Sequence, residues 1–300
     1  PECTTVRGAA VRFHVVAFGC SYGSVRVWDW QARQEVQQLA VGASGRGMDV
    51  AWRGDLLAGA GCDLKNAYVW NGVNGSLLHT LTGHTTQCLS VAWHASGLLA
   101  TGDYGNVRVW NGLTGAQQRV LTEGSNYNQG VAWYGDLLAG ANNDQYVRVW
   151  NGVNGSLLRT LSGHTSSVYR VAWHRSGLLA SSSYDDSVKV WSMDSATPLH
   201  TLATGSEAWG LDWSGDVLAS VAWNGKVWMW NGTDGSVLQE IPQAHASGTT
   251  YYMGLSWNED GSMLATSAPV DNSVLLMMRG TVLMDGPPDE GSLSSLIRLD

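Results

Sequence analysis

From Val147 to Trp191 the chain reads VRVWNGVNGSLLRTLSGHTSSVYRVAWHRSGLLASSSYDDSVKVW. Four runs in it, VRVW, SLLRTL, VYRVAW and LLASSS, have the alternating, β-branched and aromatic character of half-buried strands. Asn-Gly, Gly-His and Ser-Gly pairs separate the runs, and such residues favour turns. The stretch ends on VKVW, close to the VRVW with which it begins. We therefore predict a unit of about four strands that repeats along the chain.

The repeat covers nearly the whole sequence and is marked by a tryptophan in the third strand of each unit. These tryptophans recur at intervals of about 40 residues, at Trp28, Trp70, Trp110, Trp150, Trp191 and Trp230. A seventh unit, DNSVLLM, places Met277 at the same position. Four strands at this period are typical of the blade of a β-propeller.

The motifs within the units resemble those of the WD-repeat β-propeller family. They include Gly83-His84, Gly163-His164 and the VAW runs that end at Trp93 and Trp173. Trp28-Asp29 is the one Trp-Asp pair at these strand ends, and most units carry Trp-Asn instead. Asn keeps the short side-chain acceptor that a turn needs, so we expect the fold to tolerate this departure.

This resemblance implies an all-β fold, a seven-bladed β-propeller of four-stranded antiparallel blades over residues 1–286. We expect the ring to be closed either by the segment Cys3–Val6 or by the C-terminal tail, residues 287–300, pairing with the first blade; alternatively the tail begins a further blade. An eight-bladed ring and a truncated second propeller are the alternatives. First hairpins alternate between short and long along the chain, which indicates that blades were duplicated in pairs.

The resemblance also implies a hydrogen-bonded network in which a histidine, a Ser or Thr, an aspartate and the third-strand tryptophan take part. The fifth unit matches best, with His164, Ser181 or Ser183, Asp185 and Trp191. The third unit offers His84, Thr101, Asp103 and Trp110, with a turn one residue shorter. Because these residues recur in several units, we interpret them as structural and not as a catalytic Ser–His–Asp set.

Aromatic and charged residues gather in the loops that join second to third strands and fourth to first strands, which share one rim of a propeller. Exposed aromatics and Arg on a rigid rim are typical anchors of a protein interface. The candidate rim residues are Arg46, Asp63, Lys65, Tyr104, Tyr127, Asn143, Tyr146, Tyr184, Trp209 and Trp223. The alternative is that these aromatics pack beneath their loops.

Composition excludes several classes of function. The formal charge of −8 opposes a phosphate-binding surface, so we expect no nucleic-acid partner. No apolar run approaches the ~20 residues of a membrane helix. The histidines lack metal-ligand spacing, and no CxxC pair exists among Cys3, Cys20, Cys62 and Cys88. We therefore expect no metal or cofactor, free thiols, and a reducing, intracellular and cytoplasmic setting.

These observations favour a non-catalytic protein–protein interaction scaffold, as a subunit or module of a larger assembly. This function is implied by the family resemblance, and no converging acid, base or metal cluster points to an enzyme. The competing prediction is a propeller that binds a small ligand or a carbohydrate. Repeated loops would favour that competitor, whereas the rim loops GASGRG, EGSNYN and TGSEAW differ, as one large asymmetric partner requires.

Overall fold

The computed structural model describes residues 6–20, 24–40, 48–61, 65–242, 244, 254–258, 260–268, 273–279 and 293–299. The described residues form strands and turns and no helix, so no helix among them could cross a membrane. The first sixteen strands are β1 Val6–Arg12, β2 Val15–Cys20, β3 Ser24–Asp29, β4 Gln34–Ala40, β5 Met48–Arg53, β6 Leu56–Gly61, β7 Asn66–Asn71, β8 Leu77–Thr82, β9 Ser90–Trp93, β10 Leu98–Gly102, β11 Tyr104–Asn111, β12 Gln117–Tyr134, β13 Leu137–Asn142, β14 Val147–Asn151, β15 Leu157–Leu161 and β16 Val168–Trp173. The remaining strands are β17 Leu179–Ser183, β18 Ser187–Trp191, β19 His200–Ala203, β20 Ala208–Ser214, β21 Val217–Ala222, β22 Val227–Asn231, β23 Val237–Ile241, β24 Gly254–Trp257, β25 Met263–Ala268, β26 Ser273–Arg279 and β27 Leu293–Leu299.

All sheets are antiparallel, and consecutive strands are neighbours in each. Five sheets have four strands: β1–β4, β5–β8, β16–β19, β20–β23 and β24–β27. A seven-stranded sheet holds β9 to β15 in chain order. Within it the long strand β12 pairs with β11 through its first half and with β13 through its second half. Because β12 continues without a break, it is both the outer strand of one four-stranded unit and the inner strand of the next.

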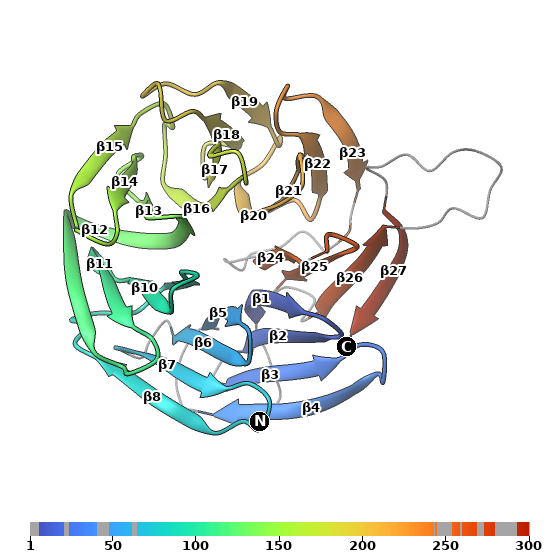
Figure 1. Cartoon of the computed structure of the whole chain (residues 1–300). Helices are drawn as coiled ribbons and strands as arrows, with labels where there is room; N and C mark the ends of the chain where they lie inside the picture. Colours follow the sequence, from blue (N-terminus) through green and yellow to red (C-terminus); the bar gives the residue numbers. More distant parts are fainter. Residues whose placement is uncertain are drawn as a thin grey trace.

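The sheets are arranged as a ring, with the first strand of each nearest the axis (Figure 1). Successive inner strands contact one another from β1 through β5, β9, β12, β16 and β20 to β24, and β24 contacts β1. The ring thus closes by packing between its first and last sheets. This is the all-β, propeller-like architecture that the repeat predicts.

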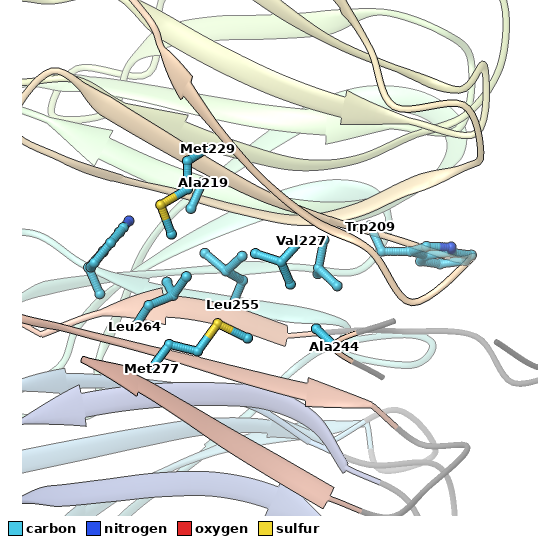
Figure 2. Close-up of a cluster of buried hydrophobic side chains, with 10 residues drawn as sticks. Trp209, Ala219, Val227, Met229, Ala244, Leu255, Leu264 and Met277 are labelled. Atoms are coloured by element: carbon cyan, nitrogen blue, oxygen red, sulfur yellow. The ribbon is translucent and has the colours of Figure 1, made fainter. Parts of the chain in front are cut away.

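Each sheet buries apolar side chains against the next, and the third-strand tryptophans lie in these clusters as predicted. Trp191 is fully buried against Val147 and Val149 of the preceding sheet, for example. Between the last two sheets Met277 takes the tryptophan's place and packs with Leu255 and Met229 (Figure 2). Since both faces of a sheet need a neighbour, burial of this kind holds the ring together.

The Trp-Asn-Gly sequences make the turns between third and fourth strands. In one of them Asn71 Oδ1 accepts hydrogen bonds from the backbone N–H groups of Val73 and Asn74 at 2.9 and 3.1 Å. A Cβ on the following Gly72 would lie 2.1 Å from the ring of Trp52, so glycine is required there. Asn therefore supplies the turn acceptor that was expected of it.

The described part of the C-terminal tail, residues 293–299, does not pair with the first sheet, and residues 3–5, which belong to the other predicted closing segment, lie outside the described residues. Strand β27 is antiparallel to β26, with Val274 opposite Leu299, and it is the outer strand of the last sheet. The expectation that the tail pairs with the first blade is therefore wrong for residues 293–299, and these residues start no further sheet. The two ends of the ring are joined instead by the contacts of β1 with β24 and β25, which bury apolar side chains between the first and last sheets.

Candidate functional site

The polar network of the fifth unit links the strands β17 and β18 with two connecting segments, one that holds His164 and one that holds Asp185. His164 Nε2 lies 2.7 Å from Ser181 Oγ, and Trp191 Nε1 donates to the same oxygen at 2.8 Å. His164 Nδ1 donates to Asp185 Oδ2 at 2.8 Å. Ser183, the alternative to Ser181, instead donates to the Ser166 carbonyl at 3.2 Å. The structure therefore brings together the predicted His, Ser, Asp and Trp side chains, with Ser181 as the serine.

The charges of this network suit a structural role. Burial lowers the pKa of His164, so the ring is neutral and accepts the Ser181 hydroxyl at Nε2. Burial alone would raise the pKa of Asp185, but hydrogen bonds from His164 and Ser187 hold it well below its usual range. Ser181 is fully buried, which keeps its hydroxyl from any substrate in solvent. This Ser–His–Asp arrangement pins the loop to the strands and offers no accessible nucleophile.

The third unit uses the same residue types differently. His84 Nε2 lies 2.8 Å from Thr101 Oγ1, and Trp110 Nε1 donates to that oxygen at 2.9 Å. Asp103, however, accepts a hydrogen bond from Arg108 Nε at 3.0 Å and forms a buried ion pair with it. The predicted four-residue network is therefore three residues plus a separate ion pair, because the shorter turn places Asp103 beside Arg108.

This arrangement predicts a pH-dependent stability. Burial, and secondarily the Arg108 charge, lower the pKa of His84 from 6.5 to about 4. Between pH 6.5 and pH 4 the histidine is therefore protonated in the unfolded chain but neutral in the folded chain, so the folded state loses stability as the pH falls. The free energy of unfolding of the wild type, relative to that of a His84→Gln variant, should decrease by about 3 kcal/mol between pH 7 and pH 4. Urea unfolding of both proteins at several pH values measures this, and parallel curves would contradict it.

Exposed tyrosines lie along the rim where second strands end and third strands begin. Tyr104 is 38% exposed, and its ring meets that of Tyr127 edge-on with centroids 4.8 Å apart. Tyr146 is 40% exposed, and the Arg148 guanidinium lies 5.6 Å from its ring centroid. Tyr104 begins β11, Tyr127 lies opposite it within β12, and Tyr146 directly precedes β14, so these residues form a row and not a single cluster.

The row continues through three aromatic rings that contact one another, those of Tyr184, Tyr169 and Trp209. The sequence pattern predicted the first and the last of these as rim residues but not Tyr169. Tyr184 is 44% exposed and meets Tyr169 edge-on, with centroids 6.2 Å apart. Tyr169 in turn stacks on Trp209, with centroids 3.8 Å apart and an interplanar angle of 16°. We call Tyr104, Tyr127, Tyr146, Tyr169, Tyr184 and Trp223 the aromatic rim.

The assignment of Trp209 to the exposed rim is wrong. Its side chain is buried in the cluster between the last two sheets, where it lies near Val227 and Ala244 (Figure 2). A tryptophan at the start of β20 has the adjacent sheet's Tyr169 to stack on, so burial is the favoured outcome. Trp223 is half-buried and packs against the same cluster. Trp209 therefore supports the rim from beneath.

The other rim candidates are more scattered. Lys65 is exposed and Asn143 is half-buried, with its backbone N–H donating to the Tyr127 carbonyl at 3.2 Å. Arg46 and Asp63 lie outside the described residues. Tyr169 is absent from the predicted set because it stands within the strand β16, whereas the predicted residues come from loops.

The cysteines correct one expectation. Cys20 is fully buried and disulfide-bonded, so the prediction of free thiols is wrong for this residue. Cys88 carries a buried thiol outside any disulfide, and its Sγ lies 3.5 Å from His84 Nε2. Cys3 and Cys62 lie outside the described residues.

Within the part of the chain that the structure describes, no three His, Cys, Asp or Glu side chains gather as metal ligands do.

Comparison with known proteins agrees with the repeat. The family model for the WD domain, G-beta repeat, matches residues 75–111 and 155–192. No curated protein matches the chain. The crystal structure of the computationally designed Ika8 protein is similar, with a TM-score of 0.70 at 20% sequence identity over 92% of this chain and 97% of that chain. This likeness shows the fold alone. The two matched repeats support a WD-repeat family, and the tryptophan period and the buried network of the fifth unit agree with this.

Proposed function

We propose that this chain is a seven-bladed propeller that acts as a non-catalytic scaffold, binding another protein through the aromatic rim within a larger assembly. WD repeats generally mediate protein–protein interaction, and that general role supports the proposal. Seven four-stranded units can be traced if β12 is counted in two of them. The single observation that carries the docking face is the row of exposed tyrosines Tyr104, Tyr146 and Tyr184, the last of which packs against the stacked rings of Tyr169 and Trp209.

The physical argument rests on preorganisation. Tyr184 is held against Tyr169, which is itself fixed by the buried Trp209. A tyrosine restrained in this way loses little rotamer freedom when a partner covers it, so more of its contact energy appears as affinity. Its ring supplies apolar area and its hydroxyl a hydrogen bond, the combination found at interface hot spots. The row is also asymmetric, since its spacing and partners change from sheet to sheet.

The test is affinity purification of the native protein in gentle salt, followed by mass spectrometry. The rim variant combines Tyr104→Ala, Tyr146→Ala and Tyr184→Ala, all at exposed side chains. A matched control combines Leu77→Ala and Leu157→Ala, which are 51% and 54% exposed on outer strands. We expect a stoichiometric partner to be bound by the wild type and the control, and to bind the rim variant about tenfold or more weaker.

Retention of the partner by the rim variant, or its loss from the control, would contradict the docking face. A wild type that recovers no partner would contradict the scaffold proposal itself. Screening on a glycan array would then test the competing function, a carbohydrate-binding propeller, for which exposed tyrosine rings beside amide side chains such as Asn143 are suitable.

A further inference from the structure

One section of the aromatic rim spans the junction between the sheets β16–β19 and β20–β23. The Ser182 hydroxyl, near the end of β17, donates to the Trp209 carbonyl, near the start of β20, at 2.9 Å. This contact places the end of one strand beside the start of the other. Tyr184 follows Ser182 by two residues, and Glu207 precedes Trp209 by two residues. Both therefore lie on the rim side of the contact.

The rings in this section leave Tyr184 open to solvent. Tyr169 stacks on the buried Trp209, with ring centroids 3.8 Å apart, so these two rings cover each other. Tyr184 meets Tyr169 edge-on and remains 44% exposed. Trp223 is half-buried and packs against the cluster that holds Trp209. A ligand can therefore reach the Tyr184 ring, which is supported from beneath by the stack.

Two carboxylates without a counter-ion flank this ring. Asp186 is exposed and shares the turn between β17 and β18 with Tyr184, and its backbone carbonyl accepts the Thr204 N–H at 3.0 Å. Glu207 is half-exposed, and its backbone carbonyl accepts the Trp223 N–H at 2.8 Å. No Lys, Arg or His among the described residues forms an ion pair with either carboxylate. This section of the rim therefore combines an accessible ring with uncompensated negative charge.

The preceding unit shows how the chain itself completes such a site. The Arg148 guanidinium lies 5.6 Å from the ring centroid of the exposed Tyr146 and forms an ion pair with Asp144 at 2.6 Å. A cation, a tyrosine ring and a carboxylate thus meet within one hairpin. In the next unit Lys189 stands where Arg148 would be, in VKVW instead of VRVW. Lys189 is buried and donates to Thr201 Oγ1 at 3.0 Å, so it supplies no cation to the turn between β17 and β18.

We propose that an arginine of the partner protein supplies this cation, with its guanidinium against the exposed ring of Tyr184 and between the carboxylates of Asp186 and Glu207. The inference rests on the proposed function, because the arginine belongs to the partner that docks on the aromatic rim. Arginine is the cation of choice, since its planar guanidinium stacks on aromatic rings and binds carboxylates through two N–H groups. The formal charge of −8 also favours the approach of a basic segment.

The first experiment titrates the full chain with three blocked peptides of sequence GSGXGSG, in which X is arginine, citrulline or lysine, and follows the NMR resonances of the protein. Citrulline keeps the shape of arginine without its charge. We expect the arginine peptide to bind about tenfold or more tightly than the citrulline peptide, and about threefold or more tightly than the lysine peptide. Equal binding of the arginine and citrulline peptides, or binding of neither, would overturn the proposal. Equal binding of the lysine peptide would overturn the assignment to arginine.

The protein-side test is a variant that combines Asp186→Asn with Glu207→Gln. Both changes keep the shape of the side chain, and they should weaken binding of the arginine peptide about tenfold or more. The matched control is Asp136→Asn, an exposed carboxylate in the turn between β12 and β13, on the opposite rim. The control should bind the arginine peptide as the wild type does. Unchanged affinity in the double variant, or an equal loss in the control, would overturn the proposal.

The double variant also separates this inference from the scaffold proposal. In the affinity purification, a partner that the rim variant loses and the Asp186→Asn, Glu207→Gln variant retains would overturn the arginine site and leave the docking face in place. A wild type that recovers no partner but binds the arginine peptide selectively would contradict the scaffold proposal and leave the arginine site in place.

Discussion

The Gly19→Ala variant should lose about 3 kcal/mol or more of its free energy of unfolding, at the upper end of what overpacking costs. Gly19 lies on β2, where a Cβ would stand 1.9 Å from the carbonyl oxygen of Met48 and 2.5 Å from its carbonyl carbon. These atoms belong to β5 of the next sheet, and backbone cannot turn aside as a side chain can. The methyl group therefore forces the first two sheets apart. Urea unfolding followed by tryptophan fluorescence measures the loss.

Gly135→Ala is the matched control. Gly135 stands in the turn between β12 and β13 and has a φ of +49°, and a methyl group at this position would have no other atom within 4 Å. Its alanine variant should lose only about 1 kcal/mol, the cost of a left-handed backbone conformation. A loss at Gly135 as large as that at Gly19 would show that backbone strain, and not contact between the sheets, limits stability.

The repeat could be predicted from sequence because each period places one residue type in one environment. Trp110 and Trp191 recur at the same strand position, and both are buried against the preceding sheet. Even Met277, the departure from the pattern, occupies the place that its spacing assigns (Figure 2). The repeat predicts features that are local to one unit: the position of a strand, its turn and the side chains that face inward. These features were predicted well.

Contacts that differ between units could not be predicted in this way. Trp209 looked like a loop residue because nothing in its own unit shows that Tyr169, in the preceding sheet, offers a ring to stack on. Asp49 and Arg170 are 121 residues apart in sequence and meet across the axis, a contact that no repeat spacing encodes. The support beneath the candidate rim depends on such contacts, so it required the structure.

The ion pair of the third unit leads to the second large effect. Asp103→Ala should cost about 3–5 kcal/mol, because it leaves the Arg108 charge buried without a counter-ion. Arg108 is 7% exposed and Asp103 is fully buried, with Nε 3.0 Å from Oδ2. The Gln117 side chain, which accepts from Arg108 at 3.0 Å, remains but carries no charge. Urea unfolding at pH 7 measures the change.

Two companion variants decide whether the buried charge is the cause. Adding Arg108→Met to Asp103→Ala removes the unpaired charge and should restore most of the loss, since a buried pair replaced by apolar groups is often close to neutral. Asp144→Ala breaks the equivalent but more exposed pair with Arg148 in the next unit, and should cost about 1 kcal/mol or less. A double variant as unstable as Asp103→Ala would instead assign the loss to the turn that Asp103 occupies, where its backbone carbonyl accepts the Asn128 N–H at 3.1 Å.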